Sequence, residues 1–216
     1  MPIAKNRILF EDNHLLIVNK LSGELSVQGA GKVQKLSLLD FLKQDYPKLR
    51  PLNRLDFETS GIVLFAKTKD AYEAVREKMH EWEKTYKTLV KGQFKYQSGT
   101  ISIPIAARSS ADKVEAQTKY RVLGSAHSIS FVEATIRSGK YHQIRKHLAE
   151  IHHPLVLDSV YGDKKFNSAF SREFRLKKFF LHSYSLSFVH PITAEKIVVK
   201  AELPGVFKSV LKKLGL

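Results

Sequence analysis

A basic and an acidic side chain stand two residues apart in the run Asn53–Gly61, which reads NRLDFETSG. Arg54 can make charge-assisted hydrogen bonds to a phosphate or to a carboxylate. Asp56 falls between an expected helix and an expected strand, so we place it on a loop, where a rigid scaffold often holds functional groups. Asp, Thr, Ser and Gly are also common turn residues, and a turn capped by the Asp56 side chain is the alternative interpretation.

A second polar run, Ser138–His147, leads from a glycine turn into an expected helix. Ile144 and Leu148 have the spacing of an inward-facing apolar stripe. His142 and Arg145 lie three residues apart and share one face beside that stripe. Arg145 is therefore expected to be partly buried, and a partly buried arginine needs an acidic partner or an anionic ligand.

The third candidate is Lys84-Thr85-Tyr86, which opens an expected strand. A tyrosine on a strand usually packs in the core; the alternative is a ring that lines a pocket with its hydroxyl available. The sequence has no HExxH, GxGxxG or GxSxG motif and no cysteine. These absences disfavour a metal site, a dinucleotide enzyme and a serine hydrolase.

Short apolar segments and a few amphipathic ones must position these side chains. We expect helices at 38–46, 70–83, from near 141, and at 206–214, and strands at 8–10, 15–19, 61–67, 85–90, 118–123, 128–136, 183–189 and 196–201. We place a turn at Gly124-Ser125. Many strands and few helices without βαβ alternation predict an α+β fold, with a largely antiparallel or mixed sheet and flanking helices. Residues 1–216 are expected to form a single catalytic domain.

The charge balance points to a polyanionic partner. The 216 residues include 36 Lys and Arg but only 21 Asp and Glu, which gives a net charge of +15. The excess is spread along the chain and is densest over residues 121–180. One interpretation is an ordinary solvated surface, and the more specific one is a surface that binds the phosphates of a nucleic-acid backbone. Charge alone leaves RNA, DNA and an anionic membrane open. The lack of a signal peptide or of a long apolar segment predicts a cytoplasmic protein without a membrane partner.

Several of these segments together resemble one family. Asn53–Lys67, NRLDFETSGIVLFAK, resembles the aspartate motif of RluA-type pseudouridine synthases, and Ser138–Gly162 resembles their second long motif. Lys84-Thr85-Tyr86 resembles their tyrosine motif. The early ILFEDNHLLIVNK, the segments Ala116–Leu123 and Leu181–Pro191, and LPGVF near the end also match in order. The resemblance covers nearly the whole chain.

This resemblance implies a role for each candidate residue. Asp56 would be the catalytic aspartate, and Arg145 would pair with it and keep it ionised. Tyr86 would stack near the target base and is the candidate proton-transfer group. Arg54 would hold the flipped nucleotide or fill the gap that it leaves. Further RNA contacts are expected from Lys140, His142 and Gln143.

The implied reaction is the isomerisation of uridine to pseudouridine in structured RNA, either ribosomal or transfer RNA. The N1–C1′ bond breaks, the uracil turns, and a C5–C1′ bond forms after the nucleotide has left the stack. No metal, cofactor or obligatory protein partner is implied. Whether Asp56 attacks the base, attacks the sugar or assists elimination stays open, as do the RNA and the uridine.

Two positions depart from the family pattern. Asn53 stands where the family usually has histidine, and Lys20-Leu21-Ser22-Gly23 stands where it usually has Lys-Pro-x-Gly. Many relatives also carry an N-terminal S4-like RNA-binding module, which we do not expect in this sequence. A catalytically silent RNA-binding protein on the same fold is the rival hypothesis. A DNA-binding protein is disfavoured because no recognition helix is evident.

Overall fold

A computed structural model describes residues 3–29, 35–107 and 112–216. The chain divides into two compact units. Unit 1 consists of Met1–Lys84 and Ser183–Glu202, and unit 2 consists of Thr85–His182 and Leu203–Leu216. The α+β prediction with a largely antiparallel sheet is confirmed. The expectation of a single catalytic domain stays a prediction.

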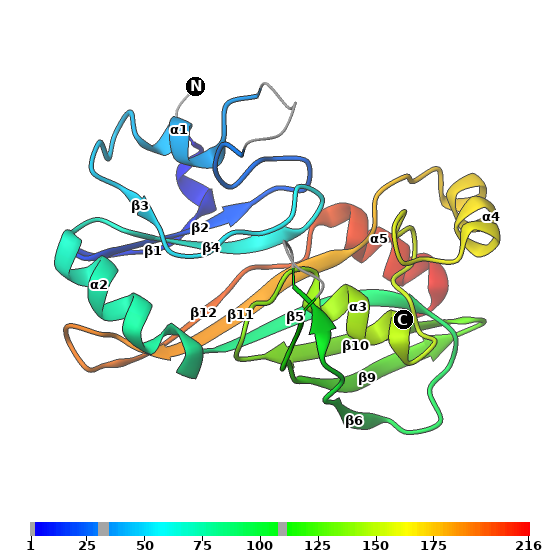
Figure 1. The fold of residues 1–216 in the computed structure, drawn as a ribbon. Coiled ribbons are helices and arrows are strands. Elements are labelled where there is room, and N and C mark those ends of the chain that lie inside the picture. The colour runs from blue at the N-terminus through cyan, green and yellow to red at the C-terminus, as the bar shows by residue number, and fades with distance from the viewer. Residues whose placement is uncertain (1–2, 30–34, 108–111) are drawn as a thin grey trace. The chain divides into compact units, whose positions relative to one another are not determined.

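Unit 1 is built on the strand order β1-β2-β4-β11, with β3 paired to β4 and β12 paired to β11 (Figure 1). Its elements are β1 (Ile8–Glu11), β2 (Leu15–Lys20), α1 (Leu38–Leu42), β3 (Arg50–Pro51), β4 (Ser60–Ala66), α2 (Lys69–Lys78), most of β11 (Leu181–Val189) and β12 (Lys196–Lys200), with 3-10 turns at Lys5–Arg7 and Met79–Glu81.

Strands β2 and β4 of unit 1 are largely apolar, and both of their faces are covered. Successive side chains of a strand point to opposite faces. Leu15 and Ile17 of β2 therefore belong to the cluster that includes α2, whereas Leu16 and Val18 belong to the cluster that includes α1. All four are fully buried. This rigid layer supports the connection between β3 and β4, which carries Asp56.

Two predicted helices of unit 1 are shorter than expected. The helix predicted over 38–46 begins where expected, with Ser37 and Asp40 forming a capping box, but it ends at Leu42. The helix predicted over 70–83 ends at Lys78 and continues as a 3-10 turn. Trp82 then leaves the helical path and stacks on Phe188, with ring centroids 4.2 Å apart.

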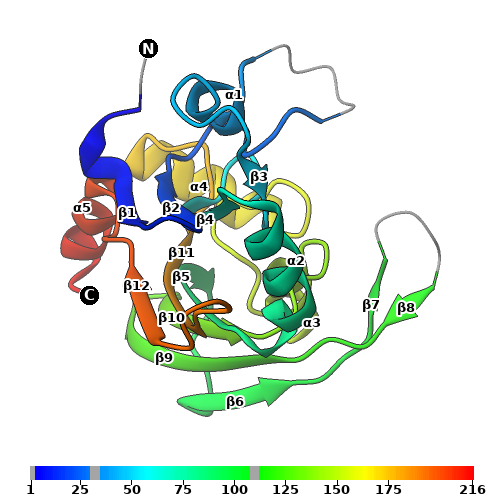
Figure 2. The same cartoon turned by 90° about the vertical axis from the view of Figure 1, so that its left-hand side faces the viewer.

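Unit 2 has the strand order β5-β10-β9-β6 and a separate antiparallel pair, β7-β8. Figure 2 shows this pair as a hairpin that extends beyond β6 and β9. The elements are β5 (Glu83–Lys91), β6 (Ser98–Ile101), β7 (Ile105–Ala106), β8 (Lys113–Val114), β9 (Thr118–Ala126), β10 (Ile129–Ile136), α3 (Gln143–Glu150), α4 (Lys164–Phe174) and α5 (Gly205–Leu214).

The turn expected at Gly124-Ser125 is wrong. Strand β9 continues to Ala126, and the chain turns at His127, whose φ is 54°. Gly124 lies opposite Phe131, where the register between β9 and β10 shifts. The glycine therefore marks an irregularity within the pair of strands, a common use of glycine in sheets, and not their connection.

Helix α4 was not expected from the sequence, although its signals are present. Asp163 caps the helix by accepting a hydrogen bond from the Phe166 backbone N–H. Phe166, Phe170 and Phe174 recur at helical spacing, and the rings of the last two stack at 4.3 Å. The many basic residues of this segment had been interpreted only as part of a charged surface.

Candidate active site

The backbone on both sides of Asp56 is anchored within unit 1. The Leu55 N–H donates to the Ser26 hydroxyl at 3.1 Å, and that hydroxyl lies 3.2 Å from the Leu55 carbonyl, to which it donates. The Phe57 carbonyl accepts from the Gly23 N–H at 2.8 Å. Asp56 itself is half-buried. The loop thus has a fixed path through the residue that the sequence singles out for chemistry.

Lys20 is the buried centre of this anchoring. Its side chain is fully buried, and Nζ donates to the carbonyls of Leu21, Glu24 and Phe57 at 3.0, 2.8 and 3.2 Å. A buried ammonium group needs such partners to offset its lost hydration. The contacts join the segment that departs from Lys-Pro-x-Gly to the Asp56 loop. The acceptor at Leu21 is a backbone carbonyl, which every residue type supplies, so the departure keeps this contact.

The two residues before Leu55 have different surroundings. The Asn53 side chain accepts a hydrogen bond from the Leu64 N–H at 2.8 Å and donates to the Ile62 carbonyl at 3.4 Å. Arg54 is exposed. An exposed guanidinium group next to a fixed loop can contact an external phosphate, which agrees with the role expected for Arg54.

In unit 2, Arg145 of α3 is only 4% exposed and has the acidic partner that its burial requires. Its Nε lies 2.7 Å from Oδ2 of Asp158, and its Nη2 lies 2.9 Å from Oδ1. The guanidinium carbon is 5.1 Å from the centre of the Tyr161 ring and 4.6 Å from that of Phe179. The bidentate pair and the two rings fix the orientation of the arginine.

Asp158 is a site residue that the sequence analysis missed. Its Oδ1 also accepts from the backbone N–H groups of Val160 and Tyr161, at 2.9 and 3.0 Å. Burial by itself would raise the pKa of this carboxyl, but the hydrogen bonds from Arg145 and from the two N–H groups outweigh burial and hold the pKa below its usual range. The available signal was its place in the Ser138–Gly162 segment, where Arg145 required an acid.

The residues around the start of α3 differ in exposure. Lys140 is exposed, and His142 is half-buried, with Nδ1 3.0 Å from the Tyr161 hydroxyl and its ring stacked on Tyr141 at 3.7 Å. Gln143 is only 2% exposed. Its Oε1 accepts from the Ser138 hydroxyl and the Lys140 N–H, and its Nε2 donates to the Gln117 carbonyl and lies within bonding distance of the Thr118 hydroxyl. Through these bonds Gln143 holds the turn that precedes the helix against the start of β9.

Tyr86 lies on β5 and is 8% exposed. It shares a strand face with Lys84 and Thr88, because side chains two residues apart point the same way. Nearly complete burial of the ring suits a packing residue, and it equally suits the wall of a narrow pocket with one edge open.

The expected site residues are divided between the two units. Arg54 and Asp56 belong to unit 1, whereas Tyr86, Arg145, Lys140, His142 and Gln143 belong to unit 2. Within the described residues, no group of three or more His, Cys, Asp or Glu could hold a metal ion. No helix in the same part of the chain is long and apolar enough to cross a membrane.

The class of protein is indicated first by the fold. A solved structure named human RNA pseudouridylate synthase domain containing 4 superposes with a TM-score of 0.81, at 24% identity, covering 97% of this chain and 93% of that chain. A second, human RNA pseudouridylate synthase domain containing 1, gives a TM-score of 0.74, at 22% identity, covering 100% and 98%. These likenesses define a pseudouridine synthase fold.

Sequence similarity then gives the family. The RNA pseudouridylate synthase family matches residues 14–150, which is more than half of the chain. The uncharacterized RNA pseudouridine synthase YhcT of Bacillus subtilis is 33% identical, over 95% of this chain and 71% of that protein. The ribosomal large subunit pseudouridine synthase C of Haemophilus influenzae is also 33% identical, over 97% and 69%. The chain belongs to the RNA pseudouridylate synthase family, and the resemblance to RluA-type enzymes is confirmed.

The chain is therefore an RNA pseudouridine synthase, an isomerase that acts on RNA. The reaction class expected from the sequence, conversion of uridine to pseudouridine, is confirmed at this level. Family membership also favours the enzyme over the silent RNA-binding protein that was its rival.

Proposed function

We propose that this enzyme isomerises uridine in large-subunit ribosomal RNA with Asp56 as its catalytic carboxylate and without a cofactor. The observation that carries the proposal is the anchoring of the Asp56 loop by Ser26, Gly23 and the buried Lys20 on either side of the carboxylate. A reactive group must be held close to its productive geometry, and a loop fixed at both flanks provides this. The ribosomal substrate is suggested by the names of relatives such as the enzyme of Vibrio cholerae, which is 30% identical over 96% of this chain and 69% of that protein.

The reaction exchanges one glycosidic bond for another. The bond from N1 to C1′ breaks and a bond from C5 to C1′ forms, C5 loses a proton, and N1 gains one. Asp56 can serve as a nucleophile or stabilise positive charge that develops at the sugar, and both roles require its ionised form. Neither role calls on a metal or an organic cofactor.

The other expected residues would act around the detached base. Arg145 would keep Asp56 ionised; its Nε and Nη2 bind Asp158, and a guanidinium group can bind a second carboxylate through its other nitrogen. Tyr86 would support the uracil while it turns and could transfer a proton. Arg54, Lys140 and His142 would contact the RNA, and Gln143, also expected to do so, would support them through the turn that it clamps.

The decisive experiment is pseudouridine mapping. Carbodiimide labelling and reverse transcription are applied to total RNA from cells with the gene, without it, and complemented with wild type or Asp56→Asn. One or a few stops should vanish on deletion and return only with wild type. The purified variant should bind RNA as wild type does, because one carboxylate contributes little to phosphate binding. Pseudouridine made by Asp56→Asn would overturn the proposed mechanism.

Two further expectations accompany this proposal. A cytoplasmic location, inferred from the sequence, stays a prediction. So does action without an obligatory protein partner, which the purified chain would show by modifying protein-free RNA.

A further inference from the structure

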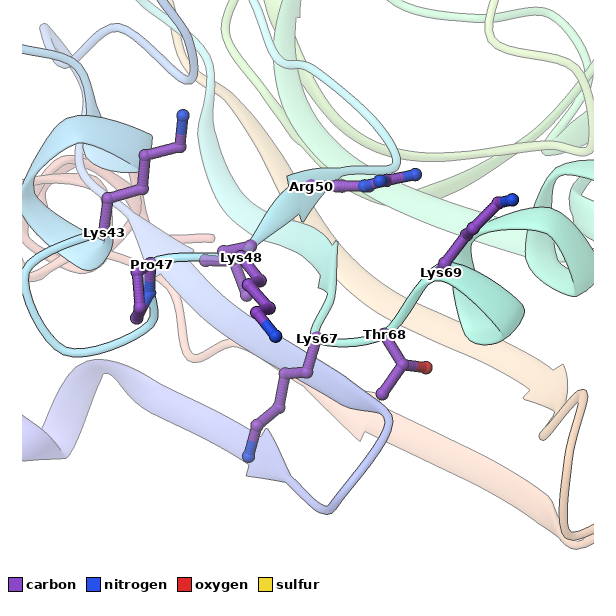
Figure 3. A pocket seen from close by; sticks show the side chains of 8 residues that line it. Lys43, Pro47, Lys48, Arg50, Lys67, Thr68 and Lys69 are labelled. Carbon is purple, nitrogen blue, oxygen red and sulfur yellow. The ribbon is translucent and has the colours of Figure 1, made fainter.

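Unit 1 contains a concave site that the proposed chemistry does not use. A pocket with a volume of about 550 Å³ lies between the end of α1, the turn before β3, and the connection from β4 to α2. Figure 3 shows the cationic side chains that line it, which come from these three segments. The charged residues of its wall are all basic: Lys43, Lys48, Arg50, Lys67 and Lys69.

Two of these cations are already engaged inside the unit. Lys67 Nζ lies 2.9 Å from Glu11 Oε1 and donates to the Asp12 carbonyl at 2.7 Å. The Arg50 guanidinium carbon stands 5.5 Å from the centre of the Tyr72 ring. These contacts hold part of the wall in place and neutralise only one of the charges.

The remaining three cations add their charges to that of Arg50. Lys43 and Lys48 are exposed, and the only acid that either is seen to influence among the described residues is Asp40, whose pKa the charge of Lys43 helps to lower. Lys69 meets Glu73 only at 3.8 Å, with both side chains more than 60% exposed, so solvent screens that pair. Like charges around a hollow repel one another and raise the local concentration of anions.

We propose that this pocket binds backbone phosphates of the substrate RNA. The inference rests on the proposed function, which supplies an RNA as the polyanion. A pocket of this size accommodates more than a single phosphate, and flexible lysines bind phosphates as point charges without reading sequence. The site would therefore add affinity and register without choosing the uridine.

The test removes two charges in a matched way. Lys43→Gln with Lys48→Gln is compared with Lys212→Gln with Lys213→Gln, an equally exposed pair in the last turn of α5. Both double variants lose the same charge, and neither pair is buried. The probe is large-subunit ribosomal RNA stripped of protein. The dissociation constant is measured from about 0.05 to 0.5 M salt, and folding is checked by thermal melting.

The pocket variant should bind about 25-fold to 60-fold more weakly at 0.1 M salt, and its salt slope should fall by about 1.4 to 1.8, because each phosphate contact contributes about 0.7 to 0.9 to the slope. The α5 variant should change much less. Equal losses in the two variants would overturn the proposal, since the effect would then be one of net charge.

A footprint separates RNA from free anions. Acetylation of lysines, read by mass spectrometry, should show Lys43 and Lys48 protected by the ribosomal RNA but not by inorganic phosphate at the same phosphate concentration. Equal protection by inorganic phosphate would overturn an RNA site in favour of a small-anion site. Pseudouridine formation by the wild type is assayed in the same samples. If no pseudouridine forms, the proposed function is refuted, whereas the binding and footprint data still test whether the pocket binds RNA.

Discussion

Replacing Lys20 by Met should separate the positioning of Asp56 from the rest of the fold. Methionine retains most of the buried aliphatic stem but removes the ammonium group and its three hydrogen bonds to backbone carbonyls. A hydrogen bond to a charged group contributes about 1.5 to 3 kcal/mol, and removing the charge also recovers some of its desolvation cost. The Phe57 carbonyl keeps the bond from Gly23. The three bonds would sum to about 4.5 to 9 kcal/mol, and the recovered desolvation cost offsets part of this, so we expect a net loss of about 2 to 3 kcal/mol.

For a chain of this length, that loss corresponds to a fall in melting temperature of roughly 4 to 12 °C. The effect on catalysis should be larger than the fraction of unfolded enzyme explains. Displacing a reacting group by about 1 Å can cost about 100-fold in rate, and the Phe57 carbonyl is directly next to Asp56. A fall of about 100-fold in kcat, with RNA affinity within a few-fold of wild type, is the expected result.

The assay is multiple-turnover pseudouridine formation with saturating RNA in excess over the enzyme, at a temperature at which both proteins are folded by circular dichroism. Ser26→Ala is the companion variant, because it frees the other flank of Asp56 while leaving the lysine intact. A Lys20→Met enzyme that melts earlier but keeps kcat within threefold of wild type would refute the positioning argument. Lys20 would then stabilise unit 1 without orienting the carboxylate.

Two other predictions concern buried charges. Asp158→Asn removes the carboxylate charge that faces Nε and Nη2 of the buried Arg145 and should destabilise the protein by about 2 to 4 kcal/mol at pH 7 in urea titrations. Because the pKa of Asp158 is lowered in the folded state, this stability is present above about pH 4 and is lost on further acidification. The free energies of unfolding of the two proteins should therefore converge at low pH. A difference that stays constant with pH would contradict the pairing. Burial lowers the pKa of Lys84 to about 8 in the folded protein. Above that pH the unfolded chain therefore binds more protons than the folded protein does. The free energy of unfolding of the wild type should rise from pH 8 to 10 by about 2 to 3 kcal/mol relative to Lys84→Met. Parallel pH curves for the two proteins would show that Lys84 does not titrate this way.

The elements that sequence predicts well are those whose signals are local. Helix α1 begins at Leu38, where the sequence predicts a helix to begin, and β2 and β4 lie where apolar residues run together. The misplaced turn at Gly124 shows the limit. A glycine can mark a turn or an irregularity inside a strand, and only the register with the partner strand, fixed by residues such as Phe131, distinguishes them.

The candidate site shows a similar division. Residue types and spacing were enough to single out Asp56 and to require an acid for Arg145. They could not identify that acid, because Asp158 lies on a loop and its selection depends on how the backbone returns to α3. The anchoring by Lys20 could not be predicted either, because its acceptors are backbone carbonyls, which every residue has.

The departure at Asn53 can be explained in the same physical terms. Arg50 and Pro51 pair with Ala66 and Phe65, and the Leu52 N–H still donates to the Leu64 carbonyl. At the next residue the chain turns away from β4, and the side chain of Asn53, in place of its backbone, makes the hydrogen bonds to β4. Its amide oxygen accepts from the Leu64 N–H and its amide nitrogen donates to the Ile62 carbonyl. A side-chain amide has the same donor and acceptor as a peptide group, so asparagine can extend the pairing by one step while the backbone is released toward Asp56. The position before Arg54 thus has a structural role in this chain, because it fixes where the pairing with β4 ends and the loop that carries Asp56 begins.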